Sequence, residues 1–494
     1  MVGPSHDDPV VRALSPVVGG PHGEHGGGSW WTPVRVVLLL VTVTFVLGLV
    51  QKAPCASDSW QNGAVRYTQM CYSDVPYLYA GRGFAEAQPP YLDNDGRYEY
   101  LEYPVLTGAF AHGAALLTHA LFGAPAVDGL PVDQVGSRPG VLDNIVPFTA
   151  VNAVLLFGCA LVTAWALAGV HRRRPWDAAL FAVAPVLVLT SLINWDLLVL
   201  ALLATALLAW SRSRPLLAGV LIGLGAAAKL FPLFVLGPIL VLCIRARRMR
   251  AFWLALVGAV SAWAVTNLPL AMANLEGWAR FWTFNSERGA DLGSLWYAWT
   301  LTGHEVSAHT INVGSWVFFG GSCLAVAAIG MFAPRRPRLP QLVFLVVAAF
   351  LLVNKVYSPQ YVLWLLPLAA LARPRWRDLL IWQGCEIVYF GAIWLHLSGD
   401  LAPAASDATP VPYVLSILVR VAGQLWLVAM VLRDVWQPWH DPVRADGITD
   451  DPAGGVLDDA LDEAPEYAVH RDTAGLTGTT GVGTPAPGQP QGSR

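Results

Sequence analysis

The sequence predicts an all-α polytopic membrane protein, a bundle of about 12 transmembrane helices with a long first external loop. Three observations lead to this fold class. Hydrophobic residues make up 55% of the 494 residues and charged residues only 13%, about half the charged share of a typical soluble domain. The apolar residues form repeated long runs, as transmembrane helices do. Short arginine-rich segments separate these runs, as in the cytoplasmic loops of membrane proteins.

The two ends of the chain are predicted to be disordered and cytoplasmic. Residues 1–32 are rich in Gly, Pro and His and show no helical period. Residues 434–494 accumulate Pro, Gly and Thr, with more acidic than basic side chains, a composition that disfavours a packed core. The transmembrane domain is expected over 33–433. Its first apolar run, 34–50, starts too far into the chain to resemble a cleaved signal peptide and is predicted to be an anchor.

Five arginine clusters lie between the apolar runs and predict the topology. They are HRRRP (171–175), SRSRP (211–215), IRARRMR (244–250), PRRPR (334–338) and RPRWR (373–377). Short basic loops stay on the cytoplasmic side of a membrane, so all five clusters are expected on one side. Between neighbouring clusters the chain must then cross the membrane an even number of times.

This rule places five turning points on the opposite, external side. They are INWD (193–196), AAAKLFP (226–232), the loop that contains FNSERGADLGSLWYAW (284–299), NKVYSPQY (354–361) and residues 398–412. The first external loop is expected at about 51–145, carrying juxtamembrane helices. Its apolar stretch 104–122 is predicted to be juxtamembrane or re-entrant, because a further span would put the arginine clusters on the wrong side.

Two of the six cysteines, Cys55 and Cys71, lie in the polar segment after the first apolar run. The other four lie in apolar runs, where a thiol behaves as a small hydrophobe. An extracytoplasmic location would allow a disulfide between Cys55 and Cys71, and the sequence leaves open whether it forms.

Unusual polar residues gather on the predicted external side. They are Asp74, Glu102, Asn194, Asp196, Lys229, Arg288, Asp291, Asn354, Lys355 and Gln360. Polar residues at membrane depth are costly and usually mark function. This one-sided distribution favours a reaction at the external leaflet, whereas an alternating-access transporter would place its site near the midplane.

Asp74 lies in YSDVPYLY, among aromatic residues. A partly dehydrated setting can raise the pKa of a carboxyl group and suit it to accept a proton from a hydroxyl. The alternative is an ordinary aspartate that caps the following helix. In EYLEYPVLTG (99–108), Glu102 could hold a sugar hydroxyl or only favour the start of a helix electrostatically.

Lys229 and Lys355 are two of only three lysines in the chain. A lysine is a flexible point charge that suits a phosphate group, although each could instead extend to the membrane interface. Arg288 is a further candidate for the same phosphate. Contacts to a sugar or an acceptor are predicted for Glu102, Tyr103, Asn194, Asp196, Gln360 and Tyr361.

Glu386 and Arg420 lie inside the last two apolar runs and are predicted to form an ion pair between helices. Arg420 could alternatively contact a lipid phosphate. The sequence shows no metal-ligand spacing, no Walker or dinucleotide fingerprint and no nucleic-acid motif. We therefore expect neither a metal nor a cofactor nor a nucleic-acid partner.

Several short segments in order resemble the GT-C superfamily of membrane glycosyltransferases, most closely glycosyltransferase family 87. They are YSDVPYLY, EYPVLTG, INWDLL, GAAAKLFPLFVLGP and NKVYSPQYVLW, between Tyr72 and the region of Tyr361. The resemblance implies a GT-C-like bundle that takes a sugar, commonly mannose, from a polyprenyl-phosphate carrier. It also implies that an aspartate of the first external loop is the catalytic base, which Asp74 matches, and that transfer inverts the anomeric centre.

The resemblance further implies a multi-pass protein of the plasma membrane, with an extracytoplasmic active site and a glycolipid or polysaccharide acceptor. Membrane lipid would surround the tail of the donor. Two other readings of the sequence remain. A transporter or flippase of lipid-linked sugars also needs an outward cationic site, but it needs no base. A structural partner of an envelope-assembly machine would carry a degenerate site.

Overall fold

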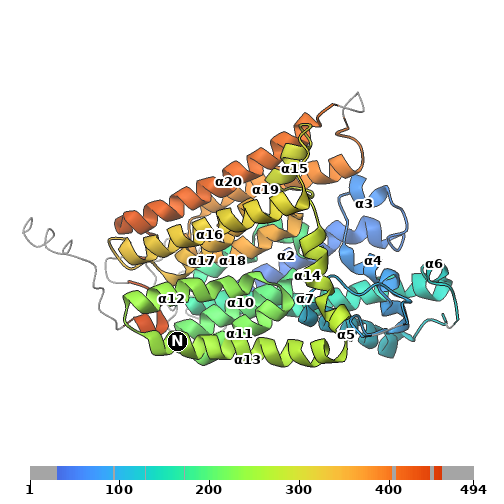
Figure 1. Cartoon of the computed structure of the whole chain (residues 1–494), viewed down its shortest axis with the longest axis horizontal. Coiled ribbons are helices and arrows are strands. Elements are labelled where there is room, and N and C mark those ends of the chain that lie inside the picture. Colours follow the sequence, from blue (N-terminus) through green and yellow to red (C-terminus); the bar gives the residue numbers. More distant parts are fainter. Residues whose placement is uncertain are drawn as a thin grey trace, which may run out of the picture.

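A computed structural model of the chain describes residues 31–92, 95–127, 129–171, 173–402, 408–445 and 450–458. Every regular element in these ranges is a helix, as predicted for an all-α protein. Figure 1 shows the long helices running roughly along the long axis of the molecule, with α20 at the top and α13 at the bottom. The predicted N-terminal tail, apart from residues 31–32, lies outside the described residues, as does 459–494.

Seven helices are long and apolar enough to cross a membrane, which indicates a membrane protein. They are α2 (Pro33–Ala56), α5 (Val105–Phe122), α7 (Pro139–Val170), α13 (Met249–Ala273), α16 (Ala308–Phe332), α19 (Trp376–Leu397) and α20 (Val411–Trp436). Their apolar side chains are exposed along much of their length, for example Met272 and Val317. Such exposure is expected of helices that face lipid.

Five shorter apolar segments of 10–17 residues are also present. They are α10 (Asp196–Ser211), α11 (Pro215–Ala228), η3 with α12 (Phe231–Val235 and Leu236–Arg245), α17 (Leu339–Val353), and η4 with α18 (Pro359–Tyr361 and Val362–Ala372). A 15-residue helix is about 23 Å long, less than the ~30 Å hydrocarbon core of a bilayer. The count of about 12 spans therefore stays a prediction.

The segment expected to cross the membrane after residue 175 is broken into three short helices. They are η2 (Pro175–Ala178), α8 (Ala179–Ala182) and α9 (Pro185–Thr190). Pro185 cannot donate a backbone hydrogen bond, and it biases Ala184 towards the extended conformation in which that residue is found. Ala184, on one side of the break, is buried, whereas Pro185 itself is exposed.

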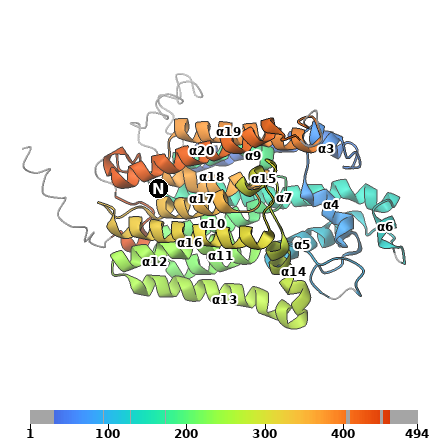
Figure 2. The same cartoon turned by 45° about the horizontal axis from the view of Figure 1, so that its top comes forward.

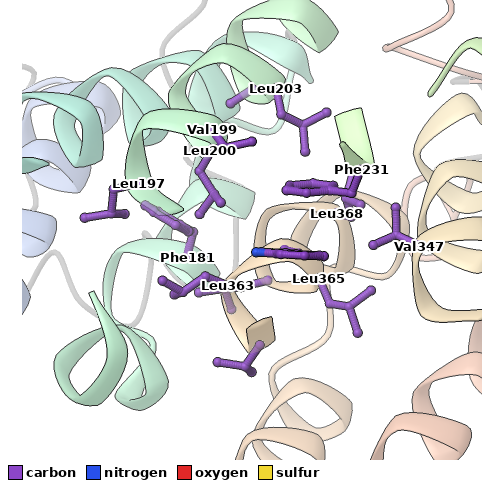
Figure 3. Close-up of a cluster of buried hydrophobic side chains, with 14 of the residues drawn as sticks. Phe181, Leu197, Val199, Leu200, Leu203, Phe231, Val347, Leu363, Leu365 and Leu368 are labelled. Atoms are coloured by element: carbon purple, nitrogen blue, oxygen red, sulfur yellow. The ribbon is translucent and has the colours of Figure 1, made fainter. Parts of the chain in front are cut away.

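The core lies between these short segments. Figure 3 shows apolar side chains that converge from α8, α10, η3, α17 and α18, namely Phe181, Leu197, Val199, Leu200, Leu203, Phe231, Val347, Leu363, Leu365 and Leu368. Phe231 stacks on Trp364 with 4.5 Å between ring centroids. This packing fixes the ends of α10, α11 and α18, which carry the polar residues of NWD, AAAK and SPQY.

α11 packs unusually closely against α13. A methyl group added to Gly219 or Gly223 would lie 2.0 or 2.2 Å from the carbonyl oxygen of Ala255 or Ala259, respectively. Small residues allow such close approach of membrane helices. The contact holds α11 firmly up to its C-terminal residue, next to Lys229.

The five arginine clusters lie at one end of the bundle, called here the arginine end. Arg212 donates to the carbonyl of Gly169 (3.2 Å), and Arg245 donates to that of Gly330 (3.1 Å). Arg338 donates to the carbonyls of residues 371 and 372 (2.8 and 2.6 Å). Each arginine thereby binds the last carbonyl groups of another helix, groups that have no partner within their own helix.

The segment after α20 packs against the arginine end, which differs from the prediction of a disordered tail from residue 434. α20 continues to Trp436, and η5 (Pro438–His440) and η6 (Gly455–Leu457) follow. Buried Asp441 accepts hydrogen bonds from Arg338 (2.8 and 2.9 Å) and Gln341 (3.1 Å). The acidic composition that suggested disorder thus includes a carboxylate that neutralises a buried arginine.

The opposite end carries the predicted first external loop. Figures 1 and 2 both show α3 (Val65–Thr68), α4 (Asp74–Gly81) and α6 (Val132–Val135) together at the end away from α12. η1 (Phe84–Glu86) follows α4. α14 (Leu275–Glu287) and α15 (Leu295–Thr300) connect α13 to α16 at the same end. We call this the cavity end, because the cavity described below opens among these elements.

α5 lies beside the first turns of α7 at the cavity end. Thr107 donates to the carbonyl of Ala228 at the end of α11 (2.7 Å), and Asn144 of α7 donates to the carbonyl of Gly123 (2.9 Å). α7 has 32 residues, and its length of about 48 Å exceeds the ~30 Å apolar core of a bilayer. These contacts are compatible with the predicted juxtamembrane helix. The length and composition of α5 are also compatible with a transmembrane span.

We predict that Asp441→Asn lowers the free energy of unfolding by about 3 kcal/mol, because it leaves the buried guanidinium of Arg338 without a counter-charge. The measurement is the thermal unfolding temperature of the purified protein in detergent. Asp133→Asn is the control, since Asp133 is an exposed aspartate of α6, where a substitution usually changes the stability by about 0.5 kcal/mol or less. Equal unfolding temperatures for the two variants would contradict the prediction.

Candidate active site

Residues 70–73 form an irregular segment that is bound to the end of α2. Cys71 forms a disulfide with Cys55, with 5.8 Å between the two Cα atoms. The Nζ of Lys52, in the same helix, donates to the carbonyl of Tyr72 (2.8 Å). Both contacts fix the segment immediately before Asp74. The disulfide is the pairing that the sequence left open.

The same segment is bound from its other side by the turn before α10. The backbone N–H of Asp74 donates to the carbonyl of Ile193 (2.7 Å), and the Ser73 hydroxyl donates to the same oxygen (3.2 Å). α4 starts at Asp74, and Ser73 is its N-cap, with its hydroxyl accepting from the N–H of Val75. Ser73, and not the carboxylate of Asp74, therefore caps the helix.

Two tyrosines bind the Asp74 carboxylate. Tyr72 donates to Oδ1 (2.8 Å) and Tyr103 donates to Oδ2 (3.1 Å). Burial raises the pKa of the Asp74 carboxyl group above its ordinary value, while both hydrogen bonds and the positive charge of Lys229 act against this rise. Burial also raises the pKa of Tyr72 and Tyr103, so both phenols stay protonated and keep donating.

Asp196 and Lys229 form a buried ion pair close to Asp74. The Nζ of Lys229 donates to Oδ1 of Asp196 (2.5 Å), and the indole of Trp364 donates to the same oxygen (2.9 Å). Asn194 accepts from the N–H of Asp196 (3.1 Å). The Lys229 ammonium also lies 5.5 Å from the ring centroid of Tyr361, within range of a cation–π contact. Lys229 is thereby fixed in position.

Arg288 is positioned by Asp291, to which its Nε donates (2.6 Å). The loop after α14 is docked on the segment before η4, because the N–H of Asp291 donates to the carbonyl of Lys355 (2.8 Å). The side chain of Lys355 extends elsewhere, and its Nζ donates to Asn312 of α16 (2.6 Å). Burial and the charge of Arg288 lower the pKa of Lys355.

A cavity of ≈ 380 Å³ collects most of the residues singled out in the sequence, a volume in the range of small-molecule sites. Asp74, Lys229 and Arg288 all line it. Of the predicted sugar and acceptor contacts, the lining includes Glu102, Tyr103, Asn194, Gln360 and Tyr361.

Two predicted residues do not line this cavity. Asp196 is 1% exposed and lies behind Lys229, so its contact is with the lysine and not with a ligand. Lys355 is turned to Asn312 and is not part of the cavity lining. The sequence located the backbone of Lys355 correctly at the cavity end, but the rotamer of its long side chain is set by α16.

The predicted ion pair of Glu386 and Arg420 is not a direct contact between these two described side chains. Glu386 accepts from the hydroxyl of Tyr357 (3.0 Å) and from Trp382 (3.0 Å). The guanidinium of Arg420 lies over the ring of the same tyrosine, 3.7 Å from its centroid, and donates to the carbonyl of Gly293 (3.3 Å). Tyr357 thus connects the two charges, and Arg420 supports the loop that follows Arg288.

Sequence reasoning missed three residues at this site. Arg82 donates to Glu102 (3.1 Å) and neutralises it. Tyr67 and Trp394 also line the cavity. Trp394 lies in an apolar helix, where an aromatic residue gives no signal of function. In the part of the chain that the structure describes, no group of three or more His, Cys, Asp or Glu side chains could hold a metal ion.

The sequence model of glycosyltransferase family 87 matches residues 141–354. This match is to the family that the short segments resemble, it contains INWDLL and GAAAKLFPLFVLGP, and it indicates glycosyltransferase activity. The matched range covers α7 to α17 and includes Asp196, Lys229 and Arg288, while Asp74 precedes it. Comparison with curated proteins finds no match.

We predict that Cys71→Ser lowers the free energy of unfolding by about 3 kcal/mol, the loop-closure value for a disulfide that spans about this length. The measurement is thermal unfolding of the oxidised protein, and a reductant should lower the wild-type unfolding temperature to that of the variant. Cys323→Ser is the control, because Cys323 is a half-buried free thiol in α16. An unfolding temperature of Cys71→Ser equal to that of wild type would refute a stabilising disulfide.

Proposed function

We propose that this glycosyltransferase moves a sugar, mannose in the first instance, from a polyprenyl-phosphate carrier to a hydroxyl group of a glycolipid or polysaccharide. Asp74 acts as the general base and the anomeric centre is inverted. One observation carries the proposal. A carboxylate that, among the described residues, accepts hydrogen bonds only from hydroxyl groups lines the same cavity as two positioned cations, Lys229 and Arg288.

Asp74 has the properties that a base for this reaction needs. Its carboxylate lines the cavity, so a hydroxyl group can reach it. Its raised pKa brings its proton affinity closer to that of the hydroxyl that it must deprotonate. The phenols of Tyr72 and Tyr103 each take one carboxylate oxygen and hold the group in one orientation, while each oxygen retains a further lone pair for the acceptor.

Lys229 and Arg288 are the phosphate ligands. Each is held by a carboxylate, Asp196 or Asp291, and each has further N–H groups beyond those that bind its partner. Charge-assisted hydrogen bonds from these groups to phosphate oxygens would stabilise the negative charge that develops as the phosphate leaves. The pairing carboxylates fix the positions of the cations before the substrate binds, which lowers the entropy cost of binding.

The proposed step is a single displacement. The acceptor hydroxyl transfers its proton to Asp74 as its oxygen forms a bond to the anomeric carbon. The bond from that carbon to the phosphate oxygen breaks, and its electron pair leaves with the polyprenyl phosphate. The proton on Asp74 is later released to water, and Lys229 and Arg288 balance the charge of the released phosphate monoester.

The location of the cavity supports a reaction on the extracytoplasmic face of the plasma membrane. The cavity lies at the end of the bundle away from the arginine clusters. Because arginine-rich loops stay in the cytoplasm, the cavity would open outward and both chain termini would be cytoplasmic. A carrier embedded in the outer leaflet could then present its phosphate and sugar to the cavity while its tail stays in membrane lipid.

We predict that Asp74→Asn lowers the transfer rate about 10³-fold, because the amide cannot accept the hydroxyl proton, while donor binding is retained. The assay uses radiolabelled polyprenyl-phosphomannose and a membrane lipid extract, with transfer measured as labelled product and binding measured by co-purification of label. Asp143→Asn, an exposed aspartate at the start of α7, is the control. Turnover that survives in Asp74→Asn removes the assigned role, and label that only crosses the bilayer identifies a flippase.

We predict a pH dependence that follows the raised pKa of Asp74. Activity requires the ionised carboxylate, so the rate should fall as the pH decreases through that raised pKa. Tyr103→Phe removes a hydrogen bond that favours the ionised form and should move the acid limb of the pH–rate profile to higher pH. Tyr98→Phe, which affects a phenol bound to Glu86, should leave the limb in place. An acid limb of Tyr103→Phe at the wild-type pH or below it would contradict the assignment.

A further inference from the structure

A second cavity, of ≈ 130 Å³, lies between α2 and α7. Its lining includes Leu49, Lys52 and Ala56 of α2 and Val146, Ala150 and Leu156 of α7. Leu49 is 42% exposed and Val146 is 36% exposed, and both belong to helices that are apolar enough to cross a membrane. Exposed apolar side chains on such helices face lipid, so the cavity opens on the lipid-facing surface of the bundle. We call it the α2–α7 crevice.

The crevice lies near the outer boundary of the membrane in the orientation proposed above. Pro33 begins α2, and Lys52 lies about 29 Å farther along the helix axis, close to the ~30 Å thickness of the apolar core of a bilayer. Lys52 is therefore at the depth at which the phosphates of outer-leaflet lipids begin. Because α2 and α7 run in opposite directions, Leu49 and Leu156 line the part of the crevice nearer the membrane centre.

The ammonium group of Lys52 is buried without a counter-charge. Lys52 is 5% exposed, so it does not extend to the interface as lysines near helix ends commonly do. Its Nζ donates to the carbonyl of Tyr72, and among the described residues no carboxylate forms an ion pair with it. Two of its three N–H groups remain for another acceptor. Because a buried charge is costly unless it is paired, this position favours an anionic ligand.

The crevice combines hydrogen-bond donors with apolar walls. Trp60 lines it and is 5% exposed, and its buried indole N–H has no acceptor among the described residues. None of the residues that line the crevice is an aspartate or a glutamate. A free phosphate ion would make no use of the apolar walls, whereas a phospholipid carries a phosphate next to a hydrocarbon chain. The chemistry of the lining therefore favours a membrane lipid.

One short segment separates the crevice from the candidate active site. Ser73 and Val75 line the crevice, whereas Tyr72 and Asp74 line the cavity of the active site. Consecutive residues thus alternate between the two, as they do in an extended chain, and Ser73 has extended backbone angles (φ −148°, ψ 141°). A lipid bound at Lys52 would consequently support this segment on the side away from the substrate.

We propose that the α2–α7 crevice binds an anionic phospholipid of the outer leaflet, with its phosphate at Lys52 and one acyl chain along Leu49 and Leu156. The bound lipid stabilises the segment that precedes Asp74. An anionic lipid is specified because the phosphate of a zwitterionic lipid is already accompanied by that lipid's own ammonium group. The assignment to the outer leaflet rests on the proposed orientation, whereas lipid binding itself does not depend on sugar transfer.

The test compares two phospholipids with identical acyl chains. The full chain is delipidated in detergent and titrated with phosphatidylglycerol, which is anionic, or with phosphatidylcholine, which is zwitterionic. Bound lipid is counted by native mass spectrometry. The wild-type protein should retain one phosphatidylglycerol and should bind it about tenfold more tightly than phosphatidylcholine, the effect of one charge-assisted hydrogen-bonded contact.

Three variants test the position of the lipid. Lys52→Met keeps an unbranched side chain without the charge and should lose the preference for phosphatidylglycerol. Ala150→Phe fills the crevice from an exposed position and should weaken the binding of both lipids about tenfold. Val154→Phe is the control, because Val154 lies one turn farther along α7, is 69% exposed and is outside the crevice lining. If Lys52→Met does not fold, the comparison of Ala150→Phe with Val154→Phe decides.

The disulfide of Cys55 and Cys71 reports on the supported segment. Both cysteines are buried, so a thiol reductant reaches the disulfide only when the segment opens. Phosphatidylglycerol at ten times its Kd should slow the reduction about tenfold in the wild-type protein. The same concentration of lipid should have little effect on Ala150→Phe.

Four results would overturn the proposal. They are equal affinity of the wild-type protein for the two lipids, an unchanged preference in Lys52→Met, equal weakening in Ala150→Phe and Val154→Phe, and tighter binding of polyprenyl monophosphate than of phosphatidylglycerol, which would assign the crevice to the carrier. A lipid that binds at Lys52 without slowing reduction would overturn the stabilisation of the segment. No measurement here uses sugar transfer, so failure of this proposal is distinct from failure of the proposed function.

Discussion

The site depends on one backbone hydrogen bond, from the N–H of Asp74 to the carbonyl of Ile193 (2.7 Å). Ile193 directly precedes Asn194 and Asp196, and Asp196 in turn holds Lys229. The bond therefore links the helix that carries the carboxylate to the turn that positions the cation. The disulfide of Cys71 fixes the other side of the same short segment. The Asp74 carboxylate and the Lys229 ammonium consequently share one rigid support, although they are 155 positions apart in the sequence.

The carboxylates around the cavity fall into two kinds. Asp196, Asp291 and Glu102 each bind a cation, namely Lys229, Arg288 or Arg82. Asp74 is different, because among the described residues its oxygens accept hydrogen bonds only from the hydroxyls of two tyrosines. The two phenols leave each oxygen of Asp74 a further lone pair. The network thus leaves one carboxylate available for proton transfer and uses the other three to position charges.

The sequence predicted features that follow from the cost of charge in a membrane. Arginine-rich turns had to share one side, and the remaining polar residues then fell together, which located Asp74, Lys229 and Arg288 near one another. The sequence could not predict the directions in which long side chains point. Lys355 reaches Asn312 instead of the cavity, and Tyr357 lies between Glu386 and Arg420. The acidic composition of the segment after α20 predicted disorder, but Asp441 of this segment pairs with the buried Arg338.

At the arginine end, one set of guanidinium groups performs two tasks. Positive charge favours the cytosolic side for short turns of this kind during biosynthesis. In the finished fold, Arg212, Arg245 and Arg338 terminate neighbouring helices. A lysine would have the same positive charge, but its ammonium could not make the planar, divergent set of hydrogen bonds that Arg338 makes. This gives a physical reason why the three lysines of the chain, Lys52, Lys229 and Lys355, all lie at the cavity end.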